Sequence, residues 1–342
     1  MALISELVDS LGGMAQKQQL VKLGARDFHL TAAVRSGDVV RVRNGWYSTL
    51  SERDPALRAV RVGGRLTGIS ALVARGAWVL DEHPLHVSVH DNAARLRTQR
   101  NRFQRLDVTA PAGVELHWDD RAIRSFGTAT SVGLLDALVR VVIDEDLETS
   151  VAVLDWALHT GELDEIDFAR LILRVPQDRQ GIAAWVDPAC ESLPESLART
   201  RLRLAGHQVE TQVRLGEVQR IDLVVDGQVA VEVDGEKFHR DRFDYDREKD
   251  VDITIDHKHS IRPSAKAVFR RWPRVALAID TALADRGVNF GNSGNRGRDA
   301  FRSRGMTGFR RGPRRRNPEF SKWGWGGDGN TGAAREGYSL RE

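Results

Sequence analysis

Hydrophobic residues in the first 36 positions repeat at the spacing of a helix. The first series consists of Ile4, Leu7, Val8 and Leu11. Two more short helices are predicted, the second over about 26–35 with Gly37 at the position of a left-handed C-cap. A valine-rich segment then passes through Asn44-Gly45, a dipeptide typical of β-hairpins. Three helices followed by a hairpin predict a winged helix-turn-helix over residues 1–50.

The pattern over residues 51–186 mixes the two periodicities. A helix is predicted over 66–79, and amphipathic helices are predicted over 134–142 and 150–159. The segments LHVSVH and VELHWDD alternate as strands do. This region is therefore expected to be a mixed α/β linker domain.

Several histidines of this region raise the question of a metal site. Their spacing matches no zinc-binding pattern, and strand alternation places two of them on one face with a serine. We therefore expect surface histidines and assign no chemistry to them. They are His83, His86, His90 and His117.

Acidic residues interrupt apolar strands in the C-terminal half. A helix is predicted from Ser192 to Gly206, with Ser192 and Glu195 in an S-x-x-E capping box. A strand near 208–215 follows, and then two strands joined by a tight turn carry three acids, Asp222, Glu232 and Asp234. Carboxylates are costly to bury among apolar residues, so these acids indicate a paired cation or a metal.

The turn between these strands decides whether two of the acids can share a metal. A strict two-residue turn would place Asp222 and Glu232 on opposite faces. A three-residue connection over 226–228 instead pairs Asp222 with Glu232, with their carboxylates within roughly 6 Å. We predict the second register because it collects the apolar residues on one face, namely Ile221, Leu223, Val225, Val229, Val231 and Val233.

Charge is distributed unevenly along the chain. Residues 287–342 hold 12 Lys+Arg and 5 Asp+Glu, a net charge of +7, whereas the preceding residues hold 39 and 43, a net charge of −4. This Arg/Gly-rich tail shows no periodicity, and we expect it to be disordered with affinity for nucleic acid. A non-functional extension explains its composition equally well.

The remaining composition bears on the compartment. No apolar run approaches the ~20 residues needed to cross a bilayer, and the amino terminus lacks the layout of a signal peptide. The lone cysteine, Cys190, excludes an internal disulfide and fits a reducing compartment. We expect a cytoplasmic protein with no membrane partner.

The first 50 residues resemble a known family. The segment GGMAQKQQLVKLGARDFHLTAAVRSGDVVRVRNGWYS is similar to the N-terminal domain of AbiEi-type antitoxins. That resemblance implies DNA binding and repression of its own operon. It places a helix in the major groove and the hairpin near phosphates, with the contacts expected from Arg26, His29, Thr31 and Arg35 on the helix and from Arg41 and Arg43 on the hairpin. Such domains also serve as protein–protein modules.

A second resemblance covers about 95 residues of the C-terminal half. Three pieces occur in the order found in the Vsr-like branch of the PD-(D/E)XK nucleases: Arg220-Ile221-Asp222, then Glu232-Val233-Asp234-Gly235 through His239, then Asp246 with Lys249 after Arg247. The resemblance implies a restriction-endonuclease-like α/β fold over 187–285 and hydrolysis of phosphodiester bonds. The chain is thus expected to be an α+β multidomain protein with domains at 1–50, 51–186 and 187–285 and a disordered tail at 286–342.

The resemblance also implies roles for individual residues. Asp222, Glu232 and the Val233 carbonyl would hold Mg²⁺, and His239 would act as general base or leaving-group acid. Glu195 is either an outer ligand or only a helix cap. Asp234 stands where the family motif has lysine, which puts activity in doubt unless Arg247, Lys249 or His239 takes over.

Two functions therefore remain open. One is a DNA-directed, Mg²⁺-dependent endonuclease. The other is a catalytically inactive, antitoxin-like transcriptional regulator with a cognate toxin or another operon partner.

Overall fold

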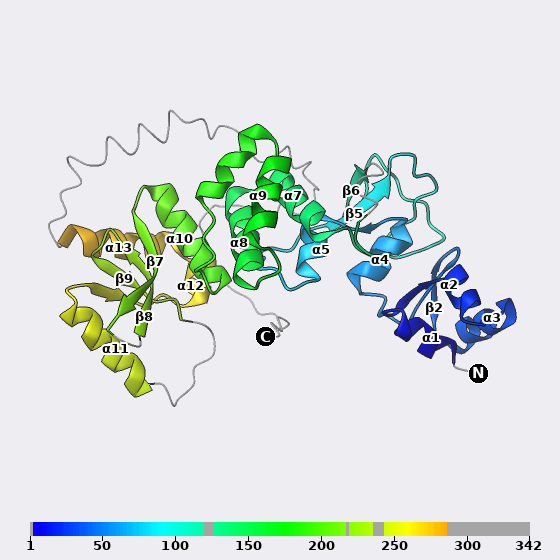
Figure 1. Cartoon of the computed structure of the whole chain (residues 1–342), viewed down its shortest axis with the longest axis horizontal. Coiled ribbons are helices and arrows are strands. Elements are labelled where there is room, and N and C mark those ends of the chain that lie inside the picture. Colours follow the sequence, from blue (N-terminus) through cyan, green and yellow to red (C-terminus); the bar gives the residue numbers. More distant parts are fainter. Residues whose placement is uncertain (1–2, 120–125, 217–218, 235–242, 286–342) are drawn as a thin grey trace, which may run out of the picture. The chain divides into compact units, whose positions relative to one another are not determined.

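The computed structural model describes residues 3–119, 126–216, 219–234 and 243–285, without the side chains of 243–247. His239 and the tail over 286–342 lie outside the described residues, so the predictions made for them remain predictions. The described chain is α+β, with helices packed on small sheets (Figure 1). None of its described helices is long and apolar enough to cross a membrane.

The N-terminal region forms three helices and a three-stranded sheet. The helices are α1 (Ile4–Ser10), α2 (Lys17–Lys22) and α3 (Asp27–Ser36), and they pack around Val8, Leu20 and Leu30. The strands are β1 (Met14–Gln16), β2 (Val40–Arg43) and β3 (Trp46–Ser48), in the order β1-β3-β2 and antiparallel. The predicted helices, hairpin and left-handed C-cap at Gly37 are all present. Strand β1 was not predicted because only three residues form it.

The middle region is built on a second small sheet. It begins with α4 (Pro55–Val62), β4 (Arg65–Leu66), α5 (Gly68–Val73), β5 (Leu85–His90) and β6 (Val114–Asp119). Four helices follow, namely α7 (Leu134–Asp144), α8 (Leu147–His159), α9 (Glu165–Arg174) and the 3-10 helix η1 (Gln177–Ala184). Strand β5 pairs antiparallel with β4 and parallel with β6, and the buried residues of these elements form one large core.

Two predictions for the middle region are wrong. The helix expected over 66–79 is only α5, because Leu66 pairs with Val87 in the sheet and Gly68, at a φ of +50°, redirects the chain. The prediction of surface histidines fails for His86 and His117, which are 5% and 8% exposed. Alternation correctly indicated which residues share a face of β5, but not that other elements cover that face.

The C-terminal region is a four-stranded sheet with helices on both faces. Its elements are α10 (Leu193–Ala205), β7 (Val209–Leu215), β8 (Gln219–Val225), β9 (Val229–Val231), α11 (Phe243–Ile255), β10 (His259–Ile261), α12 (Ala265–Arg270) and α13 (Trp272–Asp285). The strand order is β10-β9-β8-β7, with β9 and β10 parallel and the other pairs antiparallel.

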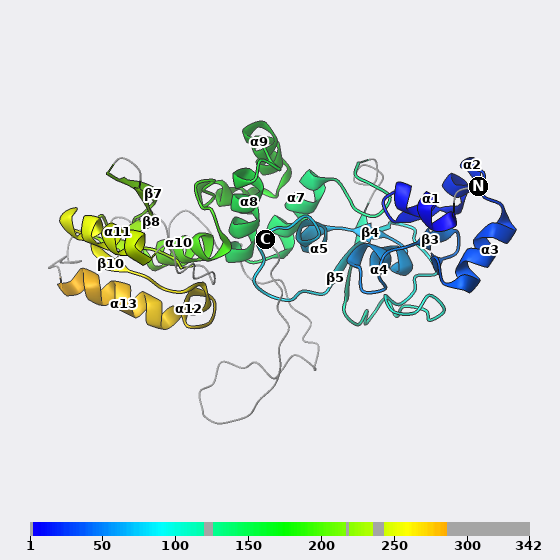
Figure 2. The same ribbon diagram turned by 90° about the horizontal axis from the view of Figure 1, so that it is seen from below.

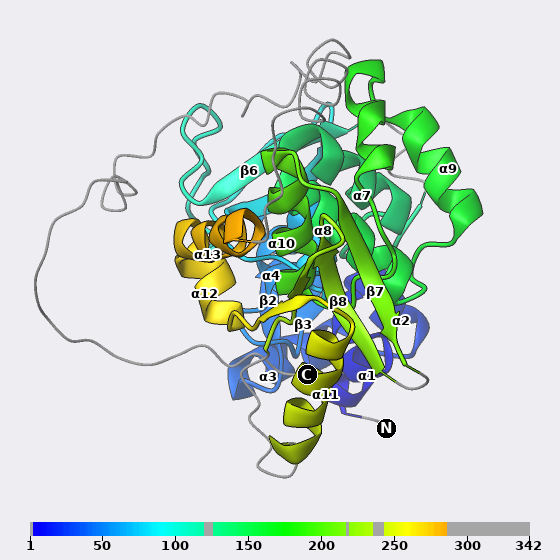
Figure 3. The same ribbon diagram turned by 90° about the vertical axis from the view of Figure 1, so that its left-hand side faces the viewer.

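The two faces of this sheet have separate cores. Leu223, Val225, Val229 and Val231 pack against α10, α12 and α13. Val224 and Ala230 pack on the opposite face with Ile253 of α11. Figure 2 shows α11 and α13 on opposite sides of β10, and Figure 3 shows β7 and β8 side by side. The apolar side chains of β8 are therefore buried on both faces of the sheet.

The predicted register of β8 and β9 is confirmed. Val225 pairs with Val229 and Leu223 with Val231. The connection carries positive φ angles at Asp226 (+49°) and Gly227 (+70°), and Gln228 N–H donates to Val225 O at 3.0 Å. Glycine thus occupies the second loop position, where a left-handed conformation is needed.

One residue departs from the predicted apolar face. Ile221 packs with Leu215, Val224 and Ile253 in the α11-side core, whereas Val233 joins the predicted face. The ladder between β7 and β8 omits a pair at Gln212, whose φ is +52°, and Asp222. This irregularity changes the strand direction at Asp222, so simple alternation fails beyond it.

Candidate functional site

Asp222 of β8 and Glu232, the residue after β9, lie together at the end of the paired strands. Each carboxylate reaches the backbone of the other strand: Asp222 N–H donates to Glu232 Oε1 at 3.3 Å, and Val233 N–H donates to Asp222 Oδ2 at 2.8 Å. Their neighbours Leu223 and Val231 point into the core formed by α10, α12 and α13. The register thus brings the two predicted acids together.

Burial and mutual repulsion oppose the ionised form of both acids. Burial raises the pKa of Glu232 to about 7, with a further upward contribution from Asp222 and a downward one from Lys249. Burial also raises the pKa of Asp222, against the hydrogen bond from Val233. Two ionised carboxylates here favour a nearby cation.

Lys249 on α11 supplies one such cation. Its ammonium group contacts Glu232 Oε2, and both side chains are largely buried. The departure at Asp234 raised the question of which residue could replace the motif lysine, with Arg247 and Lys249 as candidates among others. Lys249 is placed at the acid pair, whereas the side chain of Arg247 lies outside the described residues.

Glu195 on α10 lies near this pair. Its carboxylate accepts hydrogen bonds from Glu191 N–H (3.0 Å), Ser192 Oγ (2.6 Å) and Gln212 Nε2 (3.3 Å). The predicted capping box is absent. The Ser192 hydroxyl donates to Glu195 and makes no cap hydrogen bond with the helix backbone, and Glu195 accepts from the N–H of Glu191 and not from that of Ser192. Burial raises the pKa of Glu195, and Asp222 adds to the rise. Glu195 therefore both closes the helix start and borders the site.

Asp234 has a different environment from the other acids. Its backbone N–H donates to Pro263 O at 3.1 Å and its carbonyl accepts from Ala265 N–H at 2.9 Å. The side chain is 43% exposed, with Oδ1 3.9 Å from Arg262 Nη1. Arg262 also donates from Nε to Asp250 Oδ1 at 2.9 Å. Asp234 is thus paired with a guanidinium group.

The six residues expected to contact DNA differ in their exposure and in their contacts with the rest of the protein. Arg26, Thr31 and Arg35 of the α3 segment are exposed, and the Nδ1 atom of His29 accepts from Arg26 N–H at 3.2 Å. On β2, Arg41 donates to Asn44 Oδ1 at 2.8 Å.

Arg43 of β2 turns toward the end of α4. A Cβ atom at Gly63 would lie only 2.2 Å from Arg43 Nη1, and burial, followed by Arg97, lowers the pKa of the guanidinium. Arg43 is therefore partly buried beside Gly63, unlike the exposed residues of α3.

The donor set around Asp222 fits Mg²⁺. Carboxylate oxygens are ligands that a hard divalent cation takes, and the carboxylates of Asp222 and Glu232 lie together at the end of the paired strands. Glu195 and Asp234 add negative charge that acts on Asp222. A divalent cation would oppose the rise in these pKa values, which burial causes first and neighbouring acids increase.

Two contributors to this site were missed in the sequence. Gln212 donates to Glu195 from a position in β7 where its backbone is left-handed. A glutamine gives no indication of that conformation in the sequence. Arg262 lies just beyond β10, and its influence on Glu232 depends on β10 pairing with β9. The alternation of residues in β10 could have suggested that Arg262 lies near the sheet. The sequence did not show that β10 pairs with β9.

Comparison with known proteins adds no assignment to this geometry. A scan against models of protein families finds no match for the chain, and a search of curated proteins finds no relative.

Proposed function

We propose that the chain is a cytoplasmic, DNA-directed and Mg²⁺-dependent endonuclease. In this proposal residues 1–50 are a winged helix-turn-helix of the AbiEi type, and residues 187–285 are a Vsr-like PD-(D/E)XK nuclease domain. The observation that supports it best is the placement of Asp222 and Glu232 beside each other, with Lys249 against Glu232. Two acids and a lysine are the side chains that the PD-(D/E)XK resemblance implies for metal-dependent phosphodiester hydrolysis.

Each residue of the site has its own role in the proposed reaction. Asp222, Glu232 and the Val233 carbonyl would hold Mg²⁺, which when bound supplies a water of lowered pKa and stabilises negative charge on the phosphate. Lys249 favours the ionised form of Glu232, because its ammonium opposes the rise in pKa that burial causes. Glu195 is an outer acid held by Ser192 and Gln212. His239 remains the proposed general base or leaving-group acid.

DNA binding is assigned to α3. Arg26, Thr31 and Arg35 are exposed, and His29 lies among them on the same helix. Arg41 of β2 would lie near a phosphate, whereas Arg43 would first have to leave its place beside Gly63. The three exposed side chains of α3 are therefore the primary contacts in this proposal.

The rival function is an inactive, antitoxin-like regulator with a toxin or another operon product as partner. Two observations favour it. Lys249 already neutralises Glu232 without a metal, and Asp234, at the motif's lysine position, faces Arg262. A protein of this kind would bind DNA and leave it intact.

Incubation of supercoiled plasmid with the full chain separates the two functions. The endonuclease proposal expects nicking or linearisation with Mg²⁺, none with EDTA, and none from Asp222→Ala in Mg²⁺. Equal cleavage by wild type and Asp222→Ala would assign the activity to another site or a contaminant. Binding without cleavage by a folded wild type would favour the regulator.

A further inference from the structure

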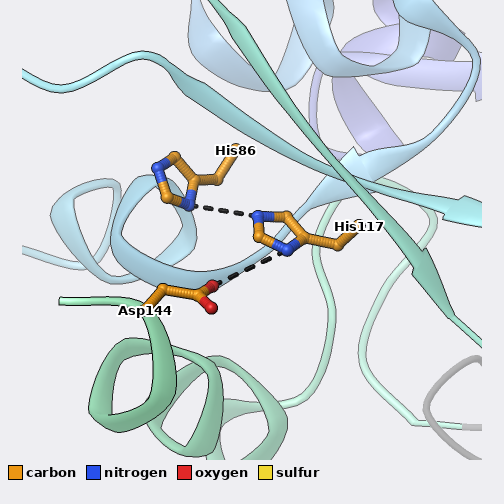
Figure 4. A group of neighbouring side chains, drawn as sticks. All are labelled: His86, His117 and Asp144. Atoms are coloured by element: carbon orange, nitrogen blue, oxygen red, sulfur yellow. Dashed lines mark hydrogen bonds and ion pairs between the residues drawn. The ribbon is translucent and has the colours of Figure 1, made fainter. Parts of the chain in front are cut away.

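Three side chains from separate elements meet in the middle region. They are His86 on β5, His117 on β6 and Asp144 at the end of α7 (Figure 4). His86 Nδ1 lies 3.2 Å from His117 Nε2, and Asp144 Oδ2 lies 3.6 Å from His117 Nδ1. Each residue offers one ligand atom such that all three atoms lie within 4.8 Å of one another.

We propose that His86, His117 and Asp144 bind a divalent transition-metal ion, with zinc as the representative of the class. Two imidazole nitrogens and one carboxylate form a donor set that suits zinc and its neighbours, and not Mg²⁺. Nitrogen ligands at about 2.0–2.1 Å in a tetrahedral zinc site lie roughly 3.3 Å apart. The observed separation of 3.2 Å between the two facing ring nitrogens matches that spacing.

Asp144 completes the donor set. Its Oδ2 atom lies 3.6 Å from the His117 ring, and one oxygen of Asp144 and one nitrogen of each histidine all lie within 4.8 Å of one another. The carboxylate thus adds an anionic ligand to the two imidazole rings.

Burial makes both rings available as ligands at neutral pH. It lowers the pKa of His86 to about 3, with smaller contributions from His117, His83 and Arg140. Burial, followed by Arg140, lowers the pKa of His117 to about 4.

The charges around the cluster call for a cation. Four carboxylates, those of Asp144, Asp119, Glu115 and Glu145, act on the cluster against the two guanidinium groups of Arg140 and Arg179, which leaves two negative charges. Burial raises the pKa of Asp144 to about 6, and Glu115 and Asp119 add to the rise against Arg140. A divalent ion would neutralise the excess.

Asp119 gives an independent indication of a ligand. It lies two residues after His117 on β6 and therefore on the same face of the strand. Its side chain is only 2% exposed, Oδ1 accepts from Arg140 at 3.1 Å, and Oδ2 is buried with no hydrogen-bond partner. A buried carboxylate oxygen without a partner is costly unless a cation or water meets it.

Metal binding here would tie α7 to the sheet of the middle region. Because His86 and His117 lie on neighbouring strands and Asp144 ends the helix, one ion would cross-link three elements that are distant in sequence. This metal site shares no residue with the proposed nuclease site, so the two sites can be tested separately.

Cobalt titration of the full chain, freed of metal by chelator dialysis, tests the proposal. Co²⁺ should produce visible ligand-field absorption that saturates at one ion per chain and is abolished by excess Zn²⁺. His117→Ala should weaken Zn²⁺ binding by about 100-fold or more. Zn²⁺ should raise the Tm of the wild type and leave that of His117→Ala unchanged, because only binding to the folded state stabilises.

Matched variants keep the result interpretable. His90→Ala removes a partly exposed histidine of the same strand and should bind Zn²⁺ as the wild type does. If circular dichroism shows that His117→Ala is unfolded, Asp144→Asn replaces it and should also weaken binding. Absence of cobalt absorption in the wild type, or unchanged affinity in the folded variants, overturns the proposal.

Discussion

Lys249 of α11 and Glu232, just beyond β9, form a largely buried ion pair on the face of the sheet that carries Asp222. Because burial and Asp222 raise the pKa of Glu232 to about 7, this lysine decides how much of Glu232 is ionised at neutral pH. Any Mg²⁺ held by Glu232 depends on that ionisation.

Replacing Lys249 should therefore impair cleavage in a pH-dependent way. In Lys249→Met the pKa of Glu232 rises further above 7, so we expect cleavage at pH 7 to fall by about tenfold or more and to recover partly at higher pH. Initial cleavage rates between pH 6 and 9 measure this effect. Lys266→Met, at an exposed lysine of α12, is the control and should match the wild type. An unchanged pH profile in Lys249→Met would show that Lys249 does not control the ionisation of Glu232.

Asp222→Asn should stabilise the metal-free protein at pH 8. The pKa values of Asp222 and Glu232 are raised above their ordinary 3.8 and 4.5, so their contribution to stability is greatest below those values and is lost as pH rises to about 7. Removing one charge should raise the free energy of unfolding by about 1–2 kcal/mol at pH 8 and by less at pH 5. The amide oxygen can still accept from Val233 N–H.

Urea unfolding with and without Mg²⁺ measures this change. Mg²⁺ should stabilise the wild type and leave Asp222→Asn unaffected, because the variant lacks the ligand charge. Glu210→Gln, at an exposed acid of β7, controls for a general effect of charge. A gain of the same size at both pH values would show that the pKa of Asp222 is not raised in the folded protein.

Arg35 offers a test of DNA binding by α3. It is exposed in the last turn of the helix, and its replacement removes a contact to a phosphate or a base edge. Arg35→Ala should weaken binding of a mixed-sequence duplex by about tenfold in fluorescence anisotropy at fixed salt. Arg170→Ala removes an exposed arginine of α9 and should have no effect. Equal affinities for all three proteins would favour the protein–protein alternative for the N-terminal region.

The tail prediction rests on sequence alone. Residues 287–342 carry 12 Lys+Arg against 5 Asp+Glu, so their deletion should weaken nonspecific DNA binding. The slope of log K against log [salt] should become shallower, because fewer counterions are released. Calorimetry should still show cooperative unfolding of the shortened chain. Loss of that cooperativity would mean that the tail contributes to the fold.

The register at Asp222 could be predicted because two independent patterns agreed. The alternation of valines required one pairing of β8 and β9, and the length of the turn allowed it. Ile221 was misplaced because the left-handed Gln212 opposite Asp222 has no signature in the sequence. Local patterns thus determined the strand pair but not the irregularity beside it.

The histidine cluster could not be predicted by the same means. His86 and His117 are 31 residues apart and meet because β5 and β6 are parallel neighbours. Parallel pairing depends on a long crossover, and the covering helix α7 comes later still in the chain. The spacing of these residues along the sequence therefore does not predict the site.

Single-turnover cleavage of supercoiled plasmid by matched variants is the most direct test of Asp222 and Glu232 as the nuclease centre. In excess Mg²⁺, wild type and Glu210→Gln should cleave at the same rate, while Asp222→Asn should be slower by at least about 1,000-fold. All three should bind the plasmid equally. Cleavage by folded Asp222→Asn at the wild-type rate, or no cleavage by folded wild type with any divalent metal, would contradict the assignment.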